Sequence, residues 1–312
     1  MDKISQYRSL LGLLRSERFV SGSVLAQQLG VSRTVVNRRL QELEGMGLRV
    51  HAVTGRGYHL ADPFTMLDDP PRGFPAALAW HHHLITTSTN EDALALVRLH
   101  EAPVLVATEY QTQGRGRRGR AWSSAFGQDL AFSLGFPLSS PEALRPFSLA
   151  AGVILAEAVA EFCGLSVSVK WPNDLQVDGA KLAGILTEIH TLERQTVVLL
   201  GIGMNVNRSD MSTIGQSAVS LAGLTGAPVD RSALLSALAG GLAAALADDF
   251  RFDWHRRWPH LDALAGKPLR VQQGESWQEG VGAGVAEDGS LRLQTRDGLQ
   301  MISGGQVSVR PL

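Results

Sequence analysis

The pattern of apolar and polar residues changes character twice along the chain. Residues 3–60 show helical spacing followed by one alternating hairpin, whereas the central part combines buried-type strands with long apolar helices. From about residue 265, short alternating runs are joined by Gly, Asp-Gly and Gly-Gly turns. The pattern predicts an α/β (α+β) multi-domain protein with domains at residues 1–62, 63–264 and 265–312, the last a small β-barrel.

The first domain has the pattern of a winged helix-turn-helix. Ser21 or Ser23 can cap a second helix that Gly30 closes, and Ser32 can cap a third, RTVVNRRLQEL, before the hairpin LRVHAVTGRGYHL. Polar side chains that remain outward on this helix and hairpin suit phosphates and base edges: Ser32, Arg33, Thr34, Asn37, Arg38 and Arg56. DNA binding is favoured over the alternative, a packing module with a solvated basic face.

Charge and cysteine content narrow the class of protein. Residues 1–60 carry nine Lys/Arg and four Asp/Glu, although the whole chain has a formal net charge of -1. A basic N-terminal piece on an acidic body suggests a small domain that faces a polyanion. Cys163 is the only cysteine, which excludes an intrachain disulfide or a zinc cluster. No signal peptide or membrane-spanning run is present, so we expect a cytoplasmic protein without membrane contact.

Residues 111–122, QTQGRGRRGRAW, interleave three glycines with four arginines. Because glycine loses much backbone entropy on folding and like charges repel, we expect this loop to be mobile until an anion orders it. The GxxxxG spacing resembles a P-loop, but Arg120 and Ala121 stand where that motif needs Lys and Ser/Thr. A phosphate clamp is therefore one interpretation, and a nonspecific nucleic-acid tether or a solvated loop are the alternatives.

The clamp lies between two apolar strands, predicted at residues 103–110 and 129–136, at one mouth of a mixed sheet. A helix at 144–163, strands at 166–171, 182–190 and 196–202, and a helix at 232–249 follow. The strand around Thr196 to Leu200 is expected to offer a pairing edge to a partner protein. Asp62 to Phe74, which is rich in proline, is predicted to be a linker.

Several polar groups can meet a ligand at the same mouth. Ser88, Thr89 and Asn90 stand together at a strand-to-helix junction, where capping explains only one of them. The Asp178-Gly179 turn places Lys181 opposite the Trp171–Asp174 corner, either as a ligand-facing cation or as a solvated edge lysine. Gly184 allows a ligand close to the backbone.

Two further motifs carry weaker signals. His81, His82 and His83 are consecutive, so a surface strand end is favoured over a metal site. GIGMNVN at 201–207 departs from a dinucleotide fingerprint because Val206 replaces the last glycine, and no helix opens there. Its glycines and asparagines instead suit a close approach of an adenosine to the backbone.

Six segments in this order and spacing point to one family: STN (88–90), GRGRRGR (114–120), KWPNDL (170–175), KLAGIL (181–186), GIGMN (201–205) and GGQVSVR (304–310). With its winged helix, the chain resembles, from end to end, the bifunctional biotin protein ligase and biotin operon repressor of bacteria. The resemblance implies a central mixed-sheet ligase domain and an SH3-like C-terminal barrel. It implies biotin and ATP with Mg²⁺ as substrates, and biotin carboxyl carrier protein and operator DNA as partners. It also implies a homodimer in the form that binds biotinyl-AMP.

The resemblance also implies roles for individual residues. The catalytic cations would be Lys181 and Arg115. From the residues themselves, Asp174 is expected to orient the amine of the carrier lysine or to accept its proton. The biotin site would comprise Ser88, Thr89, Asn90, Gln111, Arg115, Gly116, Arg117, Lys181 and Gly184. The ATP and adenylate site would comprise Arg117, Arg118, Arg120, Trp122, Asn173, Asn205 and Arg310.

The residues give these roles a physical reason, because fixed cations offset the repulsion between a carboxylate and the α-phosphate that it attacks. Gln306 stands where the family has Glu. The resemblance leaves the magnesium ligands unknown. Two alternatives remain, a biotin-sensing regulator without catalysis and a ligase for another cofactor such as lipoate.

Overall fold

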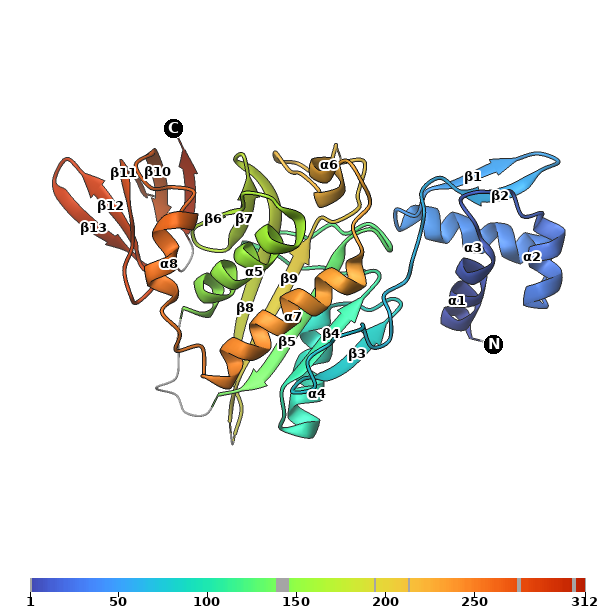
Figure 1. Cartoon of the computed structure of the whole chain (residues 1–312), viewed down its shortest axis with the longest axis horizontal. Coiled ribbons are helices and arrows are strands. Elements are labelled where there is room, and N and C mark those ends of the chain that lie inside the picture. The colour runs from blue at the N-terminus through green and yellow to red at the C-terminus, as the bar shows by residue number, and fades with distance from the viewer. Residues whose placement is uncertain are drawn as a thin grey trace.

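The structure is a computed structural model that describes residues 2–138, 146–193, 195–212, 214–273, 276–304 and 307–311. Three parts follow one another along its long axis, as Figure 1 shows: a small helical domain at one end, a central α/β domain, and a β-sheet at the other end. Among the described residues, no helix is long and apolar enough to cross a membrane. The predicted fold class is confirmed.

The N-terminal domain is a winged helix-turn-helix made of α1 (Lys3–Leu13), α2 (Gly22–Leu29), α3 (Arg33–Gly45), β1 (Val50–Val53) and β2 (Gly57–Leu60). Ser21 and Ser32 cap α2 and α3 by accepting bonds from the backbone N–H groups three residues on. Gly30 ends α2 in the left-handed conformation, with φ 65°. The predicted caps and turn are confirmed.

The central domain is built on a seven-stranded mixed sheet in the order β3-β4-β5-β9-β8-β7-β6. Only the β3/β4 pair is parallel, and the other neighbours are antiparallel. The strands are β3 (Ala79–His83), β4 (Val104–Thr108), β5 (Leu130–Pro137), β6 (Ser168–Lys170), β7 (Asp174–Val177), β8 (Ala180–Thr191) and β9 (Thr196–Met204). Asp178 and Gly179 form the predicted turn between β7 and β8, both with positive φ.

Helices cover both faces of this sheet. α4 (Thr89–His100) packs Ala93 and Val97 on one face of β4 and β9. α5 (Phe147–Cys163) and α7 (Arg231–Ala247) cover the other face, where they meet the alternate residues of the same strands, such as Leu105. α8 (Trp254–Leu261) packs beside α5, and the short α6 (Leu221–Thr225) follows the end of β9 (Figure 1). Because successive residues of these strands face helices on opposite sides of the sheet, the strands are apolar throughout.

The predicted pairing edge at Thr196 to Leu200 is wrong. β9 pairs with β5 on one side and with β8 on the other over this whole segment. The edge lies one strand further along, because β7 pairs with β8 only as far as Gly184. Beyond Ile185, the outer edge of β8 meets no other described strand as far as Thr191.

The prediction of a surface strand end for the three histidines is wrong for His82. Its side chain is 1% exposed, and its Nε2 lies 3.4 Å from Oε1 of Glu109, which is itself buried. Arg231 of α7 donates to the other carboxylate oxygen of Glu109 at 2.8 Å. On the parallel pair β3/β4, His82 lies beside Ala107, two residues before Glu109, so this strand end is an internal charge cluster.

The same cluster holds the proline-rich segment that was predicted to be a linker. The backbone N–H of Leu67 donates to Glu109, and Arg231 donates to the carbonyl of Thr65. Phe64 stacks on Phe126 with ring centroids 5.9 Å apart. The connection between the first two domains is therefore fixed to the central domain by buried groups.

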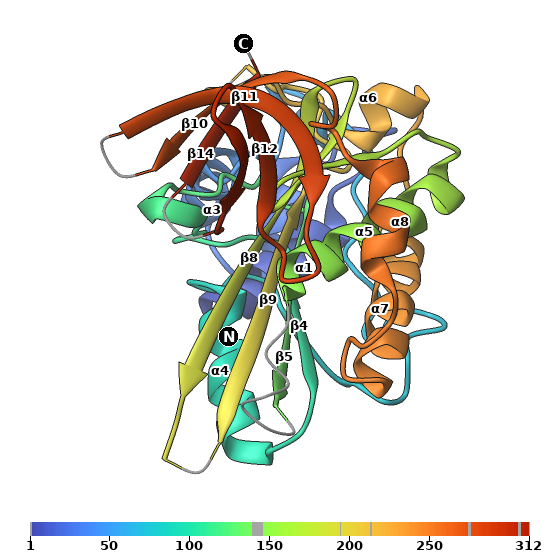
Figure 2. The same cartoon turned by 90° about the vertical axis from the view of Figure 1, so that its left-hand side faces the viewer.

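The C-terminal domain is a strongly curved five-stranded antiparallel sheet, consistent with an SH3-like barrel (Figure 2). Its strands are β10 (Pro268–Gln273), β11 (Ser276–Val285), β12 (Leu291–Thr295), β13 (Gly298–Ile302) and β14 (Val307–Pro311). The indole N–H of Trp171 donates to the carbonyl of Gly289 at 2.9 Å, so the KWPN corner docks this sheet on the central domain. Gln306 lies outside the described residues.

Candidate functional site

A pocket of ≈ 680 Å³ opens at the ends of β8 and β9. Four segments surround it: residues 111–122, which we call the Gly/Arg loop, the corner at residues 170–174, the stretch at 214–218 and the end of β14. Its lining contains each residue predicted for the biotin and ATP sites: Ser88, Thr89, Asn90, Gln111, Arg115, Gly116, Arg117, Arg118, Arg120, Trp122, Asn173, Asp174, Lys181, Gly184, Asn205 and Arg310. The fold therefore brings together residues that are as far apart in the sequence as Ser88 and Arg310.

The Gly/Arg loop forms a narrow hairpin in this structure. Gly116 donates its N–H to the carbonyl of Arg120 at 2.7 Å, and Trp122 donates to that of Gly114 at 2.8 Å. A Cβ at Gly114 would lie 2.5 Å from the Trp122 carbonyl, so the close approach requires glycine here. Arg118 at the tip has a left-handed backbone with φ 58°. The mobility of the whole loop without an anion stays a prediction.

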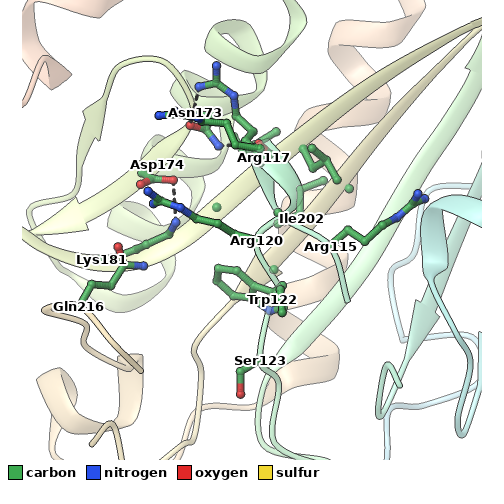
Figure 3. Close-up of a pocket in the computed structure, with 18 of the residues that line it drawn as sticks. Arg115, Arg117, Arg120, Trp122, Ser123, Asn173, Asp174, Lys181, Ile202 and Gln216 are labelled. Carbon is green, nitrogen blue, oxygen red and sulfur yellow. Dashed lines mark hydrogen bonds and ion pairs between the residues drawn. The ribbon is translucent and has the colours of Figure 1, made fainter. Parts of the chain in front are cut away.

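The arginines of this loop have different partners. Arg117 is half-buried and donates to Oδ1 of Asn173 at 3.2 Å and to the carbonyl of Gly304 at 2.6 Å. Burial lowers the pKa of Arg117, while the charge of Asp174 opposes that shift. Arg115 extends the other way (Figure 3) and lies 3.5 Å from both Glu91 and Glu188. The loop thus joins both walls of the pocket.

Lys181 and Asp174 form an ion pair in the wall of the pocket (Figure 3). The Nζ of Lys181 lies 2.9 Å from Oδ1 of Asp174, but that oxygen has no hydrogen bond of regular geometry, so the contact is mainly electrostatic. Lys181 also lies 5.5 Å from the ring centroid of Trp122. Lys170 is the strand partner of Asp174, and burial lowers the pKa of Lys170 against the attraction of that carboxylate. Cations therefore outnumber carboxylates around this part of the pocket.

The polar residues Ser88, Thr89 and Asn90, at the start of α4, are almost completely buried. Gln111 accepts a bond from the N–H of Thr89 at 2.9 Å, and the amide of Asn90 donates to Glu188 at 2.7 Å. Ser133 lies 2.6 Å from both Thr89 Oγ1 and Asn90 Oδ1. Sequence reasoning missed Ser133 and Glu188. The available signal was a polar residue within each of two apolar strands.

Glycines on β8 and β9 make room for the indole of Trp122. A Cβ at Gly203 would lie 2.2 Å from that ring, and one at Gly184 would lie 3.3 Å from it. The indole Nε1 is buried and has no hydrogen-bond partner among the described groups. Asn205 donates to the carbonyl of Val219 at 3.1 Å, whereas its Oδ1 is likewise buried without a partner. Both groups are placed to bind a polar ligand.

The candidate DNA-binding residues lie on a separate surface, at the far end of the molecule in Figure 1. Ser32, Arg33, Thr34, Asn37, Arg38 and Arg56 are all exposed. The guanidinium of Arg56 lies 4.3 Å from the ring of Phe19, and Ser32 uses its hydroxyl to cap α3. Buried Val36, Leu40 and Leu43 form the opposite side of the same helix.

Comparisons with known proteins match both the domain that holds the pocket and the N-terminal helix-turn-helix domain. Residues 84–207 match the model of the biotin/lipoate A/B protein ligase family, and residues 7–59 match that of an HTH domain. The bifunctional ligase/repressor BirA of Salmonella typhimurium is 34% identical over 97% of this chain and 97% of its own. That of Bacillus subtilis is 29% identical over 93% of this chain and 94% of its own. A biotin protein ligase from Aquifex aeolicus, solved in complex with biotin and ATP, has 28% identity and a TM-score of 0.63, covering 76% of this chain and 100% of that one.

The fold and the pocket define a ligase domain of the biotin/lipoate type that is joined to a helix-turn-helix domain. Identity to the Salmonella protein extends over nearly the full length of both chains, including the N-terminal domain. The chain belongs to the family of bifunctional ligase/repressors.

Proposed function

We propose that the chain activates biotin with ATP to biotinyl-5'-AMP and transfers the biotinyl group to a lysine of the biotin carboxyl carrier protein of acetyl-CoA carboxylase. We propose further that it represses the biotin operon as a ligand-dependent dimer. The observation that carries the ligase activity is the Lys181–Asp174 pair in a pocket lined by cations and by the buried Ser88–Asn90 junction. The family membership and the Aquifex ligase in complex with biotin and ATP support it.

In the first step, the biotin carboxylate attacks the α-phosphorus of ATP and pyrophosphate leaves. Lys181 and Arg115 offset the repulsion between the two anions, an effect that a water-poor site makes worth several kcal/mol. The ureido ring of biotin is bound by Ser88, Thr89, Asn90 and Gln111. The aliphatic tail of biotin lies along Gly116, Arg117 and Gly184. The nucleotide is bound by Arg117, Arg118, Arg120, Trp122, Asn173, Asn205 and Arg310.

In the second step, the neutral amine of the carrier lysine attacks the carbonyl of biotinyl-AMP, AMP leaves, and the amine loses a proton. Asp174 orients this amine or accepts the proton. Lys181 holds Asp174 in the free protein at 2.9 Å. When Lys181 turns to the anionic substrates, Asp174 becomes available to the amine.

The Gly/Arg loop retains the intermediate. Its contacts to Asn173 and to Gly304 close the pocket from the side of the C-terminal domain. Exclusion of water protects a mixed anhydride that would otherwise hydrolyse.

Magnesium enters with ATP. Among the described residues, no group of three His, Cys, Asp or Glu side chains could hold a metal ion. Asp174 is the one carboxylate among the described lining residues, and it is paired with Lys181. The side chains thus do not form a dedicated metal cage, which agrees with an ion held chiefly by the phosphates.

The ligase proposal is tested by ATP-dependent transfer of biotin to a purified fragment of the carrier protein. Mass spectrometry should show one added biotinyl group on the fragment, only when ATP, Mg²⁺ and biotin are all present. Lipoate in place of biotin should give no product, and a lipoylated fragment would favour the alternative ligase. Formation of neither adenylate nor product, together with tight binding of biotin, would favour a sensor without catalysis.

Repression requires operator DNA on the exposed face of α3 and the wing. One winged helix reaches one half-site, so a dimer is needed to span two. The unpaired outer edge of β8 between Ile185 and Thr191 is the surface that we propose for the dimer, and the carrier protein competes for it. The ligand-bound protein therefore either dimerises and binds DNA or binds its carrier protein. We infer a cytoplasmic location, because operator DNA and the carrier protein are both found there.

A further inference from the structure

The outward face of the C-terminal sheet carries two arginines and one tryptophan in contact. Arg270 on β10 and Arg310 on β14 are direct strand partners, so their side chains leave the sheet on the same face. Trp277 on β11 is diagonal to Arg270. The two guanidinium carbons lie 4.5 Å and 5.8 Å from the centroid of the Trp277 ring.

Two like charges at directly opposed positions on neighbouring strands repel one another. Trp277 offsets this repulsion, because its ring attracts both guanidinium groups through cation–π contacts. Glu279, the strand partner of Arg270 on its other side, lies 3.9 Å from the Nε of Arg270 and adds a weak opposite charge. Arg310 is left without a carboxylate within ion-pair distance among the described residues. The Trp277 ring is thus the favourable contact that the structure shows for the guanidinium of Arg310.

Arg310 is also the residue of this group that lines the pocket. It lies on β14, the last described strand, among the residues that line the pocket. Burial chiefly lowers the pKa of Lys170, and the charge of Arg310 adds to that shift. A guanidinium in this lining, with a second one as its neighbour, suits a ligand that carries several negative charges. The polyphosphate of ATP is such a ligand under the proposed function.

We propose that Trp277 is a positioning residue for nucleotide binding: it holds Arg310 toward the pocket, where the guanidinium binds the β- and γ-phosphates of ATP. This inference rests on the proposed ligase function for its ligand. Biotin and biotinyl-AMP lack these phosphates. Trp277 should therefore affect the use of ATP more strongly than the use of preformed adenylate, and it should not affect the use of biotin.

The test compares Trp277→Leu and Trp277→Phe with the wild type in the full-length protein. Leucine keeps an apolar side chain but removes the ring, so the KM for ATP should rise about three- to tenfold, as expected for a cation–π contact. The KM for biotin, the rate of transfer from saturating purified biotinyl-AMP and the melting temperature should not change. Phenylalanine should restore most of the ATP affinity, and Gln278→Leu on the same strand serves as the control.

Calorimetric titration of ATP without biotin gives a second readout that does not depend on catalysis. Weaker binding of ATP to Trp277→Leu than to wild type, restored in Trp277→Phe, supports the inference even if the wild type fails to form adenylate, a result that would instead refute the proposed function. Unchanged ATP affinity in a folded Trp277→Leu protein overturns the inference. A parallel loss of biotin affinity and thermal stability also overturns it, since that result indicates a merely structural role.

Discussion

Lys181 and Asp174 lie on opposite strands of one tight hairpin, and their charged atoms are 2.9 Å apart. The two residues are not direct strand partners, because Lys181 faces Gln176 and Asp174 faces Gly184. A register shift between Leu175 and Gln176 lies between them. This irregularity brings a cation and a carboxylate together in the pocket that we propose for biotin and ATP.

Lys181→Ala should slow the formation of biotinyl-AMP by roughly 10²- to 10³-fold, because one fixed cation is lost from a partly buried site. The fold should remain intact, as the side chain lines the pocket and is not part of the hydrophobic core. Adenylate formation measured with labelled ATP checks this, with Lys267→Ala, an exposed lysine of the C-terminal domain, as the control. A near-normal rate in Lys181→Ala would exclude the role.

Asp174→Asn should separate the two steps. Transfer from purified biotinyl-AMP should slow by about 10²-fold, because the amide cannot accept the proton of the attacking amine. Adenylate formation should stay close to wild type, since Lys181 keeps its charge. Single-turnover measurements of each step test the prediction, and an equal loss in both steps would contradict it.

Arg117→Gly should release the intermediate before transfer. The substitution removes the bonds to Asn173 and to the carbonyl of Gly304, and it adds backbone freedom to the loop. Escaped biotinyl-AMP should then label lysines of unrelated proteins. Mass spectrometry of a protein mixture checks this, and Arg296→Gly in an exposed turn of the C-terminal sheet is the matched control. Labelling no greater than in wild type would disprove retention by the loop.

Biotinyl-AMP should shift the protein from monomer to dimer, because an ordered Gly/Arg loop removes an entropy cost of association. Ile189→Glu should weaken this dimer, since Ile189 is 48% exposed on the free part of β8. Leu99→Glu, at an exposed position on α4, should leave it unchanged. Sedimentation with and without biotinyl-AMP gives the answer. A monomer–dimer equilibrium that ignores the ligand, or stable binding of carrier protein to the operator complex, would contradict the model.

Glu109→Gln should destabilise the fold by roughly 3–5 kcal/mol at neutral pH, because it leaves Arg231 buried without its counter-ion. Burial alone would raise the pKa of Glu109, but the charge of Arg231, the nearby His82 ring and the bond from the N–H of Leu67 outweigh it and hold the pKa at about 2. The stability that the carboxylate contributes is thus present above its ordinary pKa of 4.5 and is lost as the pH falls toward 2.

Melting temperatures of wild type and Glu109→Gln from pH 3 to pH 8 check this dependence. The difference between the two proteins should be constant above about pH 5.5 and should shrink below about pH 4.5. Glu101→Gln, at the exposed end of α4, is the control. A difference that grows on acidification would refute the assigned sign.

Local signals predicted the elements of the fold well. Ser32, Gly30 and the Asp178-Gly179 turn each act through neighbours within a few residues, so the sequence alone located them. Strand order is different, because it depends on which strands pair, and periodicity does not encode that. The apolar run at 196–204 looks the same whether it lies at an edge or, as here, between β5 and β8.

The polar residues of the pocket could be predicted only in part for the same reason. Lys181 and the Gly/Arg loop stand out by composition. By contrast, Glu188 gains its place by meeting Asn90, ninety-eight positions earlier, and Glu109 by meeting Arg231. A lone carboxylate in an apolar strand shows no partner in the sequence, so its role becomes visible only when the strands are placed.

Residues 117–128 touch both outer domains: Arg117 binds the carbonyl of Gly304 in one, and Phe126 donates its N–H to the carbonyl of Met46 in the other. Gly47 follows Met46, and a Cβ there would lie 3.1 Å from Ala125. A designer who exchanges the winged helix for another DNA-binding module would therefore need to preserve the close backbone contact at 46–47. Without that contact, the graft would disturb one end of the segment whose other end closes the ligase pocket.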